Sequence, residues 1–288
     1  MIAVAFPGQG AQKVGMVTDI SALAEEYFLQ ANDYLNYDLR DLCANGPAKK
    51  LSQTQYAQPA LLVTCYTRWL DVAHDFSARV FAGHSLGLIT AMVAAGGISF
   101  ADAVSIVAKR GSLMANASGN GGMMAILGLD VDTVEKICKD ACLHGYVQIA
   151  NYNAPGQIVV SGEALGLQQM EERAVKAGAR KIIALDVSGP FHSKLMKPVA
   201  NEFSRFLQEI EFRNPKIPVV SNVKSIFLTT KDQLKSELIS QLTSPVRWID
   251  NIHFLESQGV TEFVEVSPNP VLLGLTKRIS KGLKLTSA

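Results

Sequence analysis

The chain has 288 residues, a length that fits one large domain or a large domain with a smaller companion. Hydrophobic residues make up 48% of it and charged residues 18%, which is enough apolar material for a sizeable core and excludes wholesale disorder. Its 27 Lys and Arg residues nearly balance 26 Asp and Glu residues. No overall basic field is therefore present to hold nucleic acid, and we expect no nucleic-acid partner.

Four cysteines, Cys43, Cys65, Cys138 and Cys142, form no CxxC pair, which argues against a disulfide framework or a zinc site. We expect no bound metal and a reducing compartment. The N-terminal segment lacks the basic residues of a signal peptide. The longest apolar stretch, residues 88–98, is shorter than the ~20 residues that a membrane span needs. We therefore expect a cytoplasmic protein, monomeric and without a membrane partner.

The first part of the chain begins with a strand and continues with helices. Residues 2–6 are a short β-prone run that ends in the glycine-rich turn of residues 7–10, the pattern of a buried strand. Residues 13–80 have a mostly helical pattern. Within them, Pro59 is well placed to open a helix that runs to Ala73, because proline fits a first helical turn.

A nucleophile elbow is indicated at Gly83-His84-Ser85-Leu86-Gly87, which fits the pattern G-x-S-x-G. A short apolar strand over residues 79–82 precedes it and a helix over residues 88–95 follows, the context that the motif requires and the outline of an α/β unit. The glycines avoid Cβ clashes in the tight turn, and the helix aims its free N–H groups at an oxyanion. A helix start with Ser85 as a plain cap is the alternative.

Over residues 121–188 the alternation of predicted strands and helices differs from that of the preceding segment. This change predicts a small domain inserted into a larger one. A glycine-rich linker at residues 118–122 precedes it. The predicted order is β-α-β-β-α-β, that of a ferredoxin-like module. In chain order these elements cover residues 123–129, 131–143, 146–150, 157–161, 165–177 and 181–187. The large α/β domain then consists of residues 1–120 and 189–288.

The rest of the large domain alternates between predicted helices and strands. The helices are residues 194–210, residues 231–242, a segment from Pro245 and a lysine-rich tail from Val271; the strands are residues 217–221 and 261–266.

His192 is the best candidate for the base that activates the serine, because it follows a predicted strand in a loop that can present it. No acidic residue can be assigned to orient it from spacing alone, and a backbone carbonyl can do that work. The other histidines fit surface, turn or cleft-lining positions: His74, His84, His144 and His253.

An ordered set of motifs resembles the malonyl-CoA:acyl-carrier-protein transacylase family. The motifs are Phe6–Gln12, Gln58–Leu61, Gly83–Gly87, Arg110–Met114, Asn153–Gln157, Phe191–Ser193, Ser244–Trp248 and Gly274–Thr276. The match covers essentially the whole chain. Within the family, the chain looks closest to the discrete, trans-acting acyltransferases of polyketide synthases. The segments that carry this likeness are Leu51–Gln55, Ile217–Val223 and the Phe191 that precedes His192.

The resemblance implies a hydrolase-like large domain with a parallel sheet core, a ferredoxin-like small domain and an active site in the cleft between them. It also implies that Ser85 is the nucleophile, His192 the general base, and the backbone N–H groups of Gln9 and Leu86 the oxyanion hole. The Arg110 guanidinium would pair with the free carboxylate of a malonyl group. Malonyl-CoA would be the substrate, and the acyl carrier protein would bring its phosphopantetheine, with no permanently bound cofactor.

Further positions are expected to contact the substrate: Gln58, His84, Leu88, Asn153, Phe191 and Arg247. Leu88 departs from the family pattern, which usually has Glu there, and this leaves acyl specificity open. Arg247 stands where the bacterial fatty-acid enzyme often has glutamine. A basic rim for an acidic carrier protein is a further hypothesis, beside that of an ordinary solvated surface, and its residues are Lys194, Lys197, Lys277, Arg278 and Lys281.

The implied reaction is ping-pong, through a malonyl ester of Ser85 that the carrier thiol then attacks. Two rival activities use the same Ser/His scaffold: an acyl hydrolase that edits carrier-bound chains, and a carrier-to-carrier acyl transferase. A non-catalytic docking subunit is the rival from another class. Both polyketide and fatty acid synthesis fit the resemblance.

Overall fold

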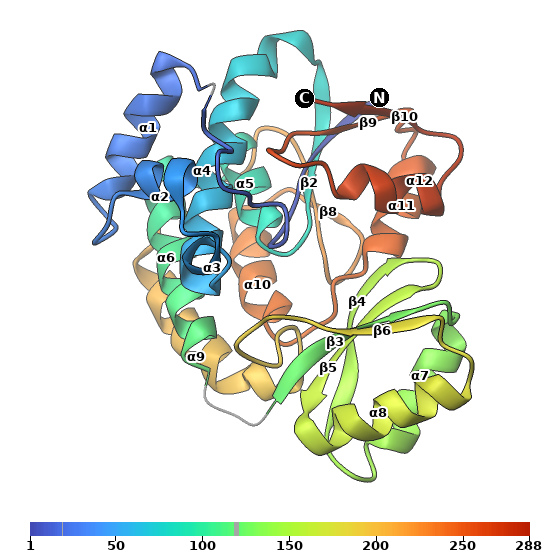
Figure 1. The fold of residues 1–288 in the computed structure, drawn as a ribbon. Coiled ribbons are helices and arrows are strands. Elements are labelled where there is room, and N and C mark those ends of the chain that lie inside the picture. Colours follow the sequence, from blue (N-terminus) through green and yellow to red (C-terminus); the bar gives the residue numbers. More distant parts are fainter. Residues whose placement is uncertain (19, 118–120) are drawn as a thin grey trace.

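A computed structural model describes residues 1–18, 20–117 and 121–288 of the chain, which form two sheets flanked by helices (Figure 1). The strands are β1 (Ile2–Phe6), β2 (Ala78–Gly83), β3 (Gly121–Leu127), β4 (Val147–Ala154), β5 (Gln157–Glu163), β6 (Lys181–Ala184), β7 (Val219–Val220), β8 (Phe227–Leu228), β9 (Glu262–Glu265) and β10 (Lys284–Ser287). One sheet has the order β10-β9-β1-β2-β7-β8 and the other the order β4-β5-β3-β6.

The α-helices are α1 (Ala22–Asn32), α2 (Leu39–Asn45), α3 (Ala48–Leu51), α4 (Thr54–Val72), α5 (Gly87–Ala94), α6 (Phe100–Ala115), α7 (Val131–Ala141), α8 (Ala164–Lys176), α9 (Lys197–Phe206), α10 (Lys231–Gln241), α11 (Trp248–Ser257) and α12 (Leu272–Ile279). Short 3-10 turns lie at Ala73–Asp75, Lys194–Met196 and Leu207–Glu209. None of the described helices is long and apolar enough to span a membrane.

The six-stranded sheet is parallel except for its β7–β8 edge. Side chains of β1 alternate between its two faces, because successive residues of a strand point to opposite sides. Val4 and Phe6 belong to the apolar cluster on the side of α4, α5 and α6, whereas Ala3 and Ala5 belong to the cluster with α11 and α12. Burial on both faces explains why β1 is continuously apolar in sequence.

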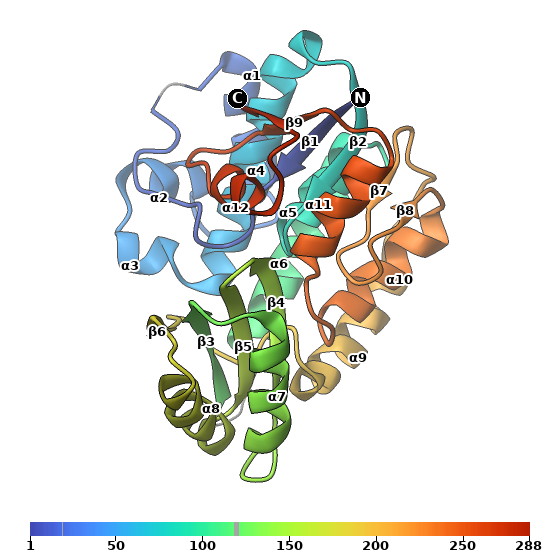
Figure 2. The ribbon, with the colours of Figure 1, turned by 90° about the vertical axis from the view of Figure 1, so that its right-hand side faces the viewer.

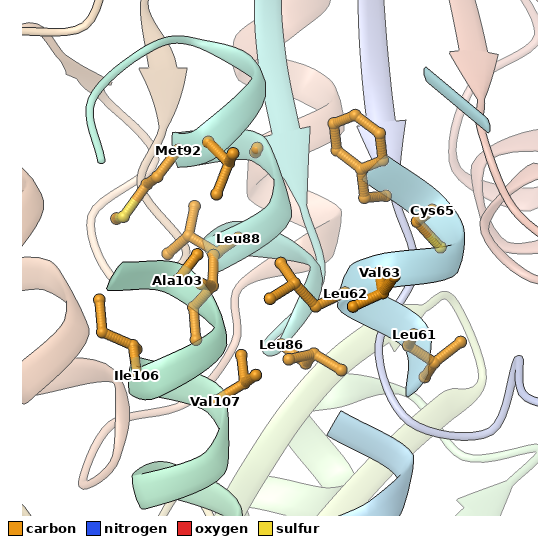
Figure 3. Close-up of a cluster of buried hydrophobic side chains, with 14 of the residues drawn as sticks. Leu61, Leu62, Val63, Cys65, Leu86, Leu88, Met92, Ala103, Ile106 and Val107 are labelled. Carbon is orange, nitrogen blue, oxygen red and sulfur yellow. The ribbon is translucent and has the colours of Figure 1, made fainter. Parts of the chain in front are cut away.

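In the apolar cluster beside the sheet, buried side chains of α4, α5 and α6 meet (Figure 3). Each helix contributes fully buried side chains, among them Leu61, Leu62 and Val63 of α4, Leu88 and Met92 of α5, and Ala103, Ile106 and Val107 of α6. This packing holds α5, and with it the turn before α5, against the sheet.

The four-stranded sheet is antiparallel throughout, and its strand order is that of a ferredoxin-like β-α-β-β-α-β unit. Helices α7 and α8 pack against each other and against one face of this sheet, around a core of their own that includes Ile126, Val160 and Met170. Figures 1 and 2 show both helices on the outer side of the small sheet, away from the large one. The expected fold class, a parallel α/β core with a second α/β unit, is confirmed.

Strand β4 contacts the large domain through the segment before α11 and through α12. The Tyr152 N–H donates to the Val246 carbonyl oxygen at 2.9 Å, and the Val246 N–H donates to the Ala150 carbonyl oxygen at 2.9 Å. Arg278 of α12 also reaches the β4–β5 turn, donating to the Pro155 carbonyl oxygen and to Gln157 Oε1, each at 2.6 Å. The small sheet is thus tied by backbone pairing to the segment before α11, and by a side chain of α12 at its β4–β5 turn.

Several sequence predictions of elements were wrong in detail. Helix α4 begins at Thr54, so Pro59 lies inside it rather than at its start; extensive burial of α4 outweighs the missing proline N–H. Strand β4 runs to Ala154, which leaves only a two-residue turn before β5. The tail ends in β10, a polar edge strand on β9 that an apolar pattern does not reveal. Of the predicted linker, residues 118–120 lie outside the described residues, and residues 121–122 open β3.

Candidate active site

Ser85 stands on a sharp turn between β2 and α5, with φ at 52°, in the left-handed region. The flanking glycines make this turn possible. A Cβ on Gly83 would come within 2.1 Å of the Gly87 carbonyl carbon, and a Cβ on Gly87 within 2.0 Å of the Phe6 carbonyl oxygen. The positive φ of Ser85 costs about 1–3 kcal/mol, which the surrounding structure must offset.

Asn222, just after β7, braces this turn on two sides. Its Oδ1 accepts a hydrogen bond from the Ser85 N–H at 2.8 Å, and its Nδ2 donates to the Gly83 carbonyl oxygen at 2.7 Å. The buried carboxylate of Glu237 in turn accepts the Asn222 N–H at 2.7 Å. Sequence reasoning missed this brace; the available signal was a polar Ser221-Asn222 pair directly after an apolar strand.

Ser85 and His192 are in hydrogen-bond contact, with 2.7 Å between Ser85 Oγ and His192 Nε2. On the other side of the ring, His192 Nδ1 lies 2.8 Å from the backbone carbonyl oxygen of Gln241. A carbonyl oxygen only accepts, so Nδ1 carries the proton and Nε2 is free to accept the serine proton. A backbone carbonyl therefore orients the candidate base, the possibility that the sequence left open.

Burial sets the protonation state of both histidines at the site. Burial, and after it the positive charge of Arg110, lowers the pKa of His192 to about 3, so the imidazole is neutral near pH 7. Burial also lowers the pKa of His84, whose Nε2 lies 2.8 Å from Asn153 Oδ1. A neutral imidazole in contact with a hydroxyl has the form that a general base requires.

Arg110 of α6 points its guanidinium at the serine although its side chain is 1% exposed. Its Nη2 donates to Ser85 Oγ at 3.2 Å and to Gln241 Oε1 at 3.0 Å, and its Nη1 donates to Gln58 Oε1 at 2.9 Å. Burial lowers its pKa to about 10, which still leaves a cation at neutral pH. Within the described residues no carboxylate pairs with this cation, so the site is built to receive an anionic group.

A cavity of about 130 Å³ opens over Ser85 between the two sheets. Most of the predicted site residues line it: Gln9, Gln58, His84, Ser85, Leu86, Arg110, Phe191 and His192. Apolar residues that the sequence reasoning did not single out complete the wall, namely Met114, Met123, Leu185 and Val187, together with Asn151. The cavity thus combines one buried cation with a largely apolar surface, which suits a short acyl group ending in a carboxylate.

We retain the prediction that the backbone N–H groups of Gln9 and Leu86 form the oxyanion hole. Both residues line the cavity with Ser85, and in the part of the chain that the structure describes neither N–H donates to a protein acceptor. Leu86 precedes α5 directly, so its N–H is one of the free donors at a helix start. Gln9 is held in place through its side chain, whose Nε2 donates to the Ser52 carbonyl oxygen at 3.2 Å.

Three predicted substrate contacts lie outside this cavity. Asn153 stands behind His84 as its hydrogen-bond partner. Leu88 is fully buried in the apolar cluster of α4, α5 and α6, so the expectation that it contacts substrate is wrong (Figure 3). Arg247 is half exposed, pairs with Asp250 at 2.6 Å and lies over the ring of Tyr152, so it also misses the cavity.

The predicted basic rim is divided in the structure. Lys194 lines a groove beside α7 and β4, whereas Lys277 and Lys281 line another beside α12 and β10. Arg278 is engaged with the β4–β5 turn. Among the residues described, no three or more His, Cys, Asp or Glu side chains gather as a candidate metal site.

A serine on a glycine-flanked elbow, touching a neutral histidine in a cleft between two α/β units, is the arrangement of enzymes that transfer acyl groups through a serine ester. Residues 4–285 match the acyl transferase domain family, and the chain belongs to that family.

Individual relatives match this chain over nearly its full length. The chain is 43% identical over 291 residues to a malonyl CoA-acyl carrier protein transacylase of Staphylococcus aureus, covering 99% of this chain and 94% of that protein. It resembles the crystal structure of an acyl carrier protein S-malonyltransferase from Vibrio cholerae, with a TM-score of 0.96, 40% identity and coverage of 100% and 96%. A malonyl-transacylase in complex with its type II polyketide acyl-carrier protein matches with a TM-score of 0.96, 38% identity and coverage of 100% and 95%.

Proposed function

We propose that this chain transfers a malonyl group from malonyl-CoA to the phosphopantetheine thiol of an acyl carrier protein, through a malonyl ester on Ser85. The names of the relatives at 38–43% identity support the reaction and both of its substrates. The observation that carries the assignment in this chain is the contact of one serine oxygen with two groups. His192 Nε2 lies 2.7 Å away and Arg110 Nη2 3.2 Å away.

The first half-reaction forms the ester. His192 removes the Ser85 proton as the oxygen attacks the malonyl thioester carbonyl, and the histidine becomes a cation held by the Gln241 carbonyl. Backbone N–H groups of Gln9 and Leu86 receive the developing oxyanion; one such donor typically contributes ~2.7–4 kcal/mol. The C–S bond breaks, and the histidine returns its proton to the CoA thiolate.

The second half-reaction runs the same steps in reverse order. His192 takes the proton of the phosphopantetheine thiol, and the thiolate attacks the ester carbonyl of malonyl-Ser85. The serine oxygen leaves and recovers a proton from His192. Because the acyl group stays on Ser85 after CoA has left, ping-pong kinetics are expected, and His192 serves as the base in both halves.

Arg110 supports the choice of a malonyl group over neutral acyl groups. A guanidinium grips a carboxylate through two parallel hydrogen bonds, and a neutral acyl chain offers it no anion. Truncated or uncharged donors would leave the buried cation without a partner in the cavity, an effect of roughly 1–3 kcal/mol or more. The cation lies beside the nucleophile and not at a distant surface, so it can discriminate at the reacting acyl group.

Intact-mass measurement after incubation with malonyl-, methylmalonyl- and acetyl-CoA tests this function. We expect a stable malonyl adduct that maps to Ser85, little acetyl adduct, and loss of the malonyl adduct when holo acyl carrier protein is added. An adduct that water removes as fast as carrier protein does would instead indicate the acyl hydrolase. Acylation from an acyl carrier protein but not from CoA would indicate the carrier-to-carrier transferase.

A further inference from the structure

A glutamine on β4 reaches from the small sheet to the loop that carries His192. Gln148 Nε2 donates a hydrogen bond to the His192 carbonyl oxygen at 3.0 Å, and Gln148 Oε1 accepts one from the Lys194 N–H at 3.2 Å. One side-chain amide therefore pairs with backbone groups on both sides of Ser193.

This double contact imitates the pairing of neighbouring strands. Ser193 is extended, with φ −132° and ψ 162°, so the carbonyl before it and the N–H after it point to the same side. The Gln148 amide takes the place of a peptide group from an adjacent strand. His192 itself has φ 57°, a conformation unfavourable for a residue other than glycine, so the loop needs such external bonds.

The alternation of β4 explains why Gln148 meets this loop. Val147 and Ile149 point into the core under α7 and α8, so Gln148 between them lies on the opposite face. Tyr146 directs the amide, because its hydroxyl donates to Gln148 Oε1. With the oxygen held there, the NH₂ group faces the His192 carbonyl.

We propose that Gln148, oriented by Tyr146, is a positioning residue that holds the His192 imidazole in line with Ser85. The proposal rests on the proposed function, since it assumes that His192 is the base. Gln148 lines the groove beside α7 and β4 and is absent from the described lining of the cavity over Ser85, so its link to the reacting serine runs through the backbone of His192. It also makes the base depend on the packing of β4 against the segment before α11.

The variant Gln148→Met keeps the length and bulk of the side chain and removes both polar groups. We expect the rate of Ser85 acylation at saturating malonyl-CoA to fall about tenfold, because a small displacement of a catalytic group is costly. KM should stay within about twofold of wild type, since the cavity wall is unchanged. Tyr146→Phe, which only frees the amide to rotate, should give a smaller loss of the same kind.

A pH profile separates positioning from a general structural effect. His192 is buried, and the charged or titratable groups that face it are Arg110 from α6 and His84 from the elbow. A loosened His192 loop admits water, which raises the pKa of the imidazole toward its ordinary value of about 6.5. The acid limb of kcat/KM should therefore move to higher pH in Gln148→Met and not in Gln168→Met, a matched control on the exposed face of α8.

The labelling rate of Ser85 by a fluorophosphonate reports the Ser85–His192 pair without any acyl-CoA. Slower labelling of Gln148→Met, with a shifted acid limb and a melting temperature within a few degrees of wild type, supports the proposal. Unchanged labelling and an unchanged acid limb in both Gln148→Met and Tyr146→Phe overturn it. If wild-type protein labels with the fluorophosphonate but forms no malonyl ester, that result contradicts the proposed function. The comparison of labelling rates between wild type and Gln148→Met then still decides the role of Gln148.

Discussion

The His192 imidazole donates its Nδ1 proton to the backbone carbonyl oxygen of Gln241 at 2.8 Å, so a peptide group and not a carboxylate orients the candidate base. A neutral partner stabilises the imidazolium less than a carboxylate would. This agrees with the low pKa of His192, which burial and the nearby Arg110 charge bring to about 3. The pair is therefore suited to a reaction in which the histidine is charged only briefly.

The buried, neutral His192 makes the stability of the fold depend on pH. An unfolded histidine binds a proton below about pH 6.5, whereas the native one does so only near pH 3. Between these values the unfolded chain holds one more proton, so the free energy of unfolding falls as pH falls, by about 1.4 kcal/mol per pH unit. Urea unfolding from pH 7 to pH 4 should show a steeper loss for wild type than for His192→Gln.

Other titrating groups are common to both proteins and cancel in this comparison. Parallel stability curves for wild type and His192→Gln across that range would show that His192 is not held neutral by burial. The contribution is fully present above the unfolded pKa and is lost on acidification, which is the sign expected for a depressed histidine pKa.

Arg110 is predicted to determine the preference for a malonyl donor. In Arg110→Ala the cation is gone, so malonyl acylation of Ser85 should fall by at least tenfold while acetyl acylation rises relative to it. Single-turnover acylation with malonyl-CoA and acetyl-CoA gives the ratio directly. Lys109→Ala is the matched control, because Lys109 is the neighbouring cation on α6 and pairs with Glu202 on the surface.

An unchanged malonyl-to-acetyl ratio in Arg110→Ala would remove Arg110 from this role. The substitution also frees Gln58 and Gln241 from their charged partner, so the melting temperature should be recorded with each rate. A fall in both acylation rates by the same factor would point to a general loss of site geometry.

The local part of the site could be predicted because its signals are consecutive in the chain. The strand, glycine-flanked turn and helix around Ser85 occupy one continuous stretch, and each element has its own sequence pattern. His192 could be proposed from its loop context although it is 107 residues away. The ferredoxin-like order was likewise readable, because each strand and helix of the small sheet shows its own periodicity.

The supporting residues could not be predicted, since their partners are remote and leave no periodic signal. Asn222 meets Ser85 across 137 residues, and Gln148 meets His192 across 44. Leu88 was misplaced for a geometric reason. Its place in α5 directs its side chain into the apolar cluster with α4 and α6, where it is fully buried, and it does not line the cavity (Figure 3).

Asn222 is predicted to stabilise both the elbow and the fold. Asn222→Ala leaves the buried Ser85 N–H and Gly83 carbonyl without their partner, which should lower the free energy of unfolding by about 2–4 kcal/mol. Urea unfolding measures this loss, and Asn45→Ala on the exposed end of α2 serves as control. A loss no larger than that of the control would mean that Asn222 does not brace the turn.

Two glycine-to-alanine changes should act in opposite directions. A Cβ on Gly87 would lie 2.0 Å from the Phe6 carbonyl oxygen, so Gly87→Ala must push α5 away from β1 and should abolish labelling of Ser85. Gly274 lies within α12 without a positive φ, and a Cβ added to it would meet no other atom within 4 Å. Gly274→Ala should therefore raise the free energy of unfolding by about 0.5–1 kcal/mol through helix propensity, with fluorophosphonate labelling unchanged. Wild-type labelling by Gly87→Ala would show that the elbow tolerates a side chain, and the steric account of the motif in this chain would then be wrong.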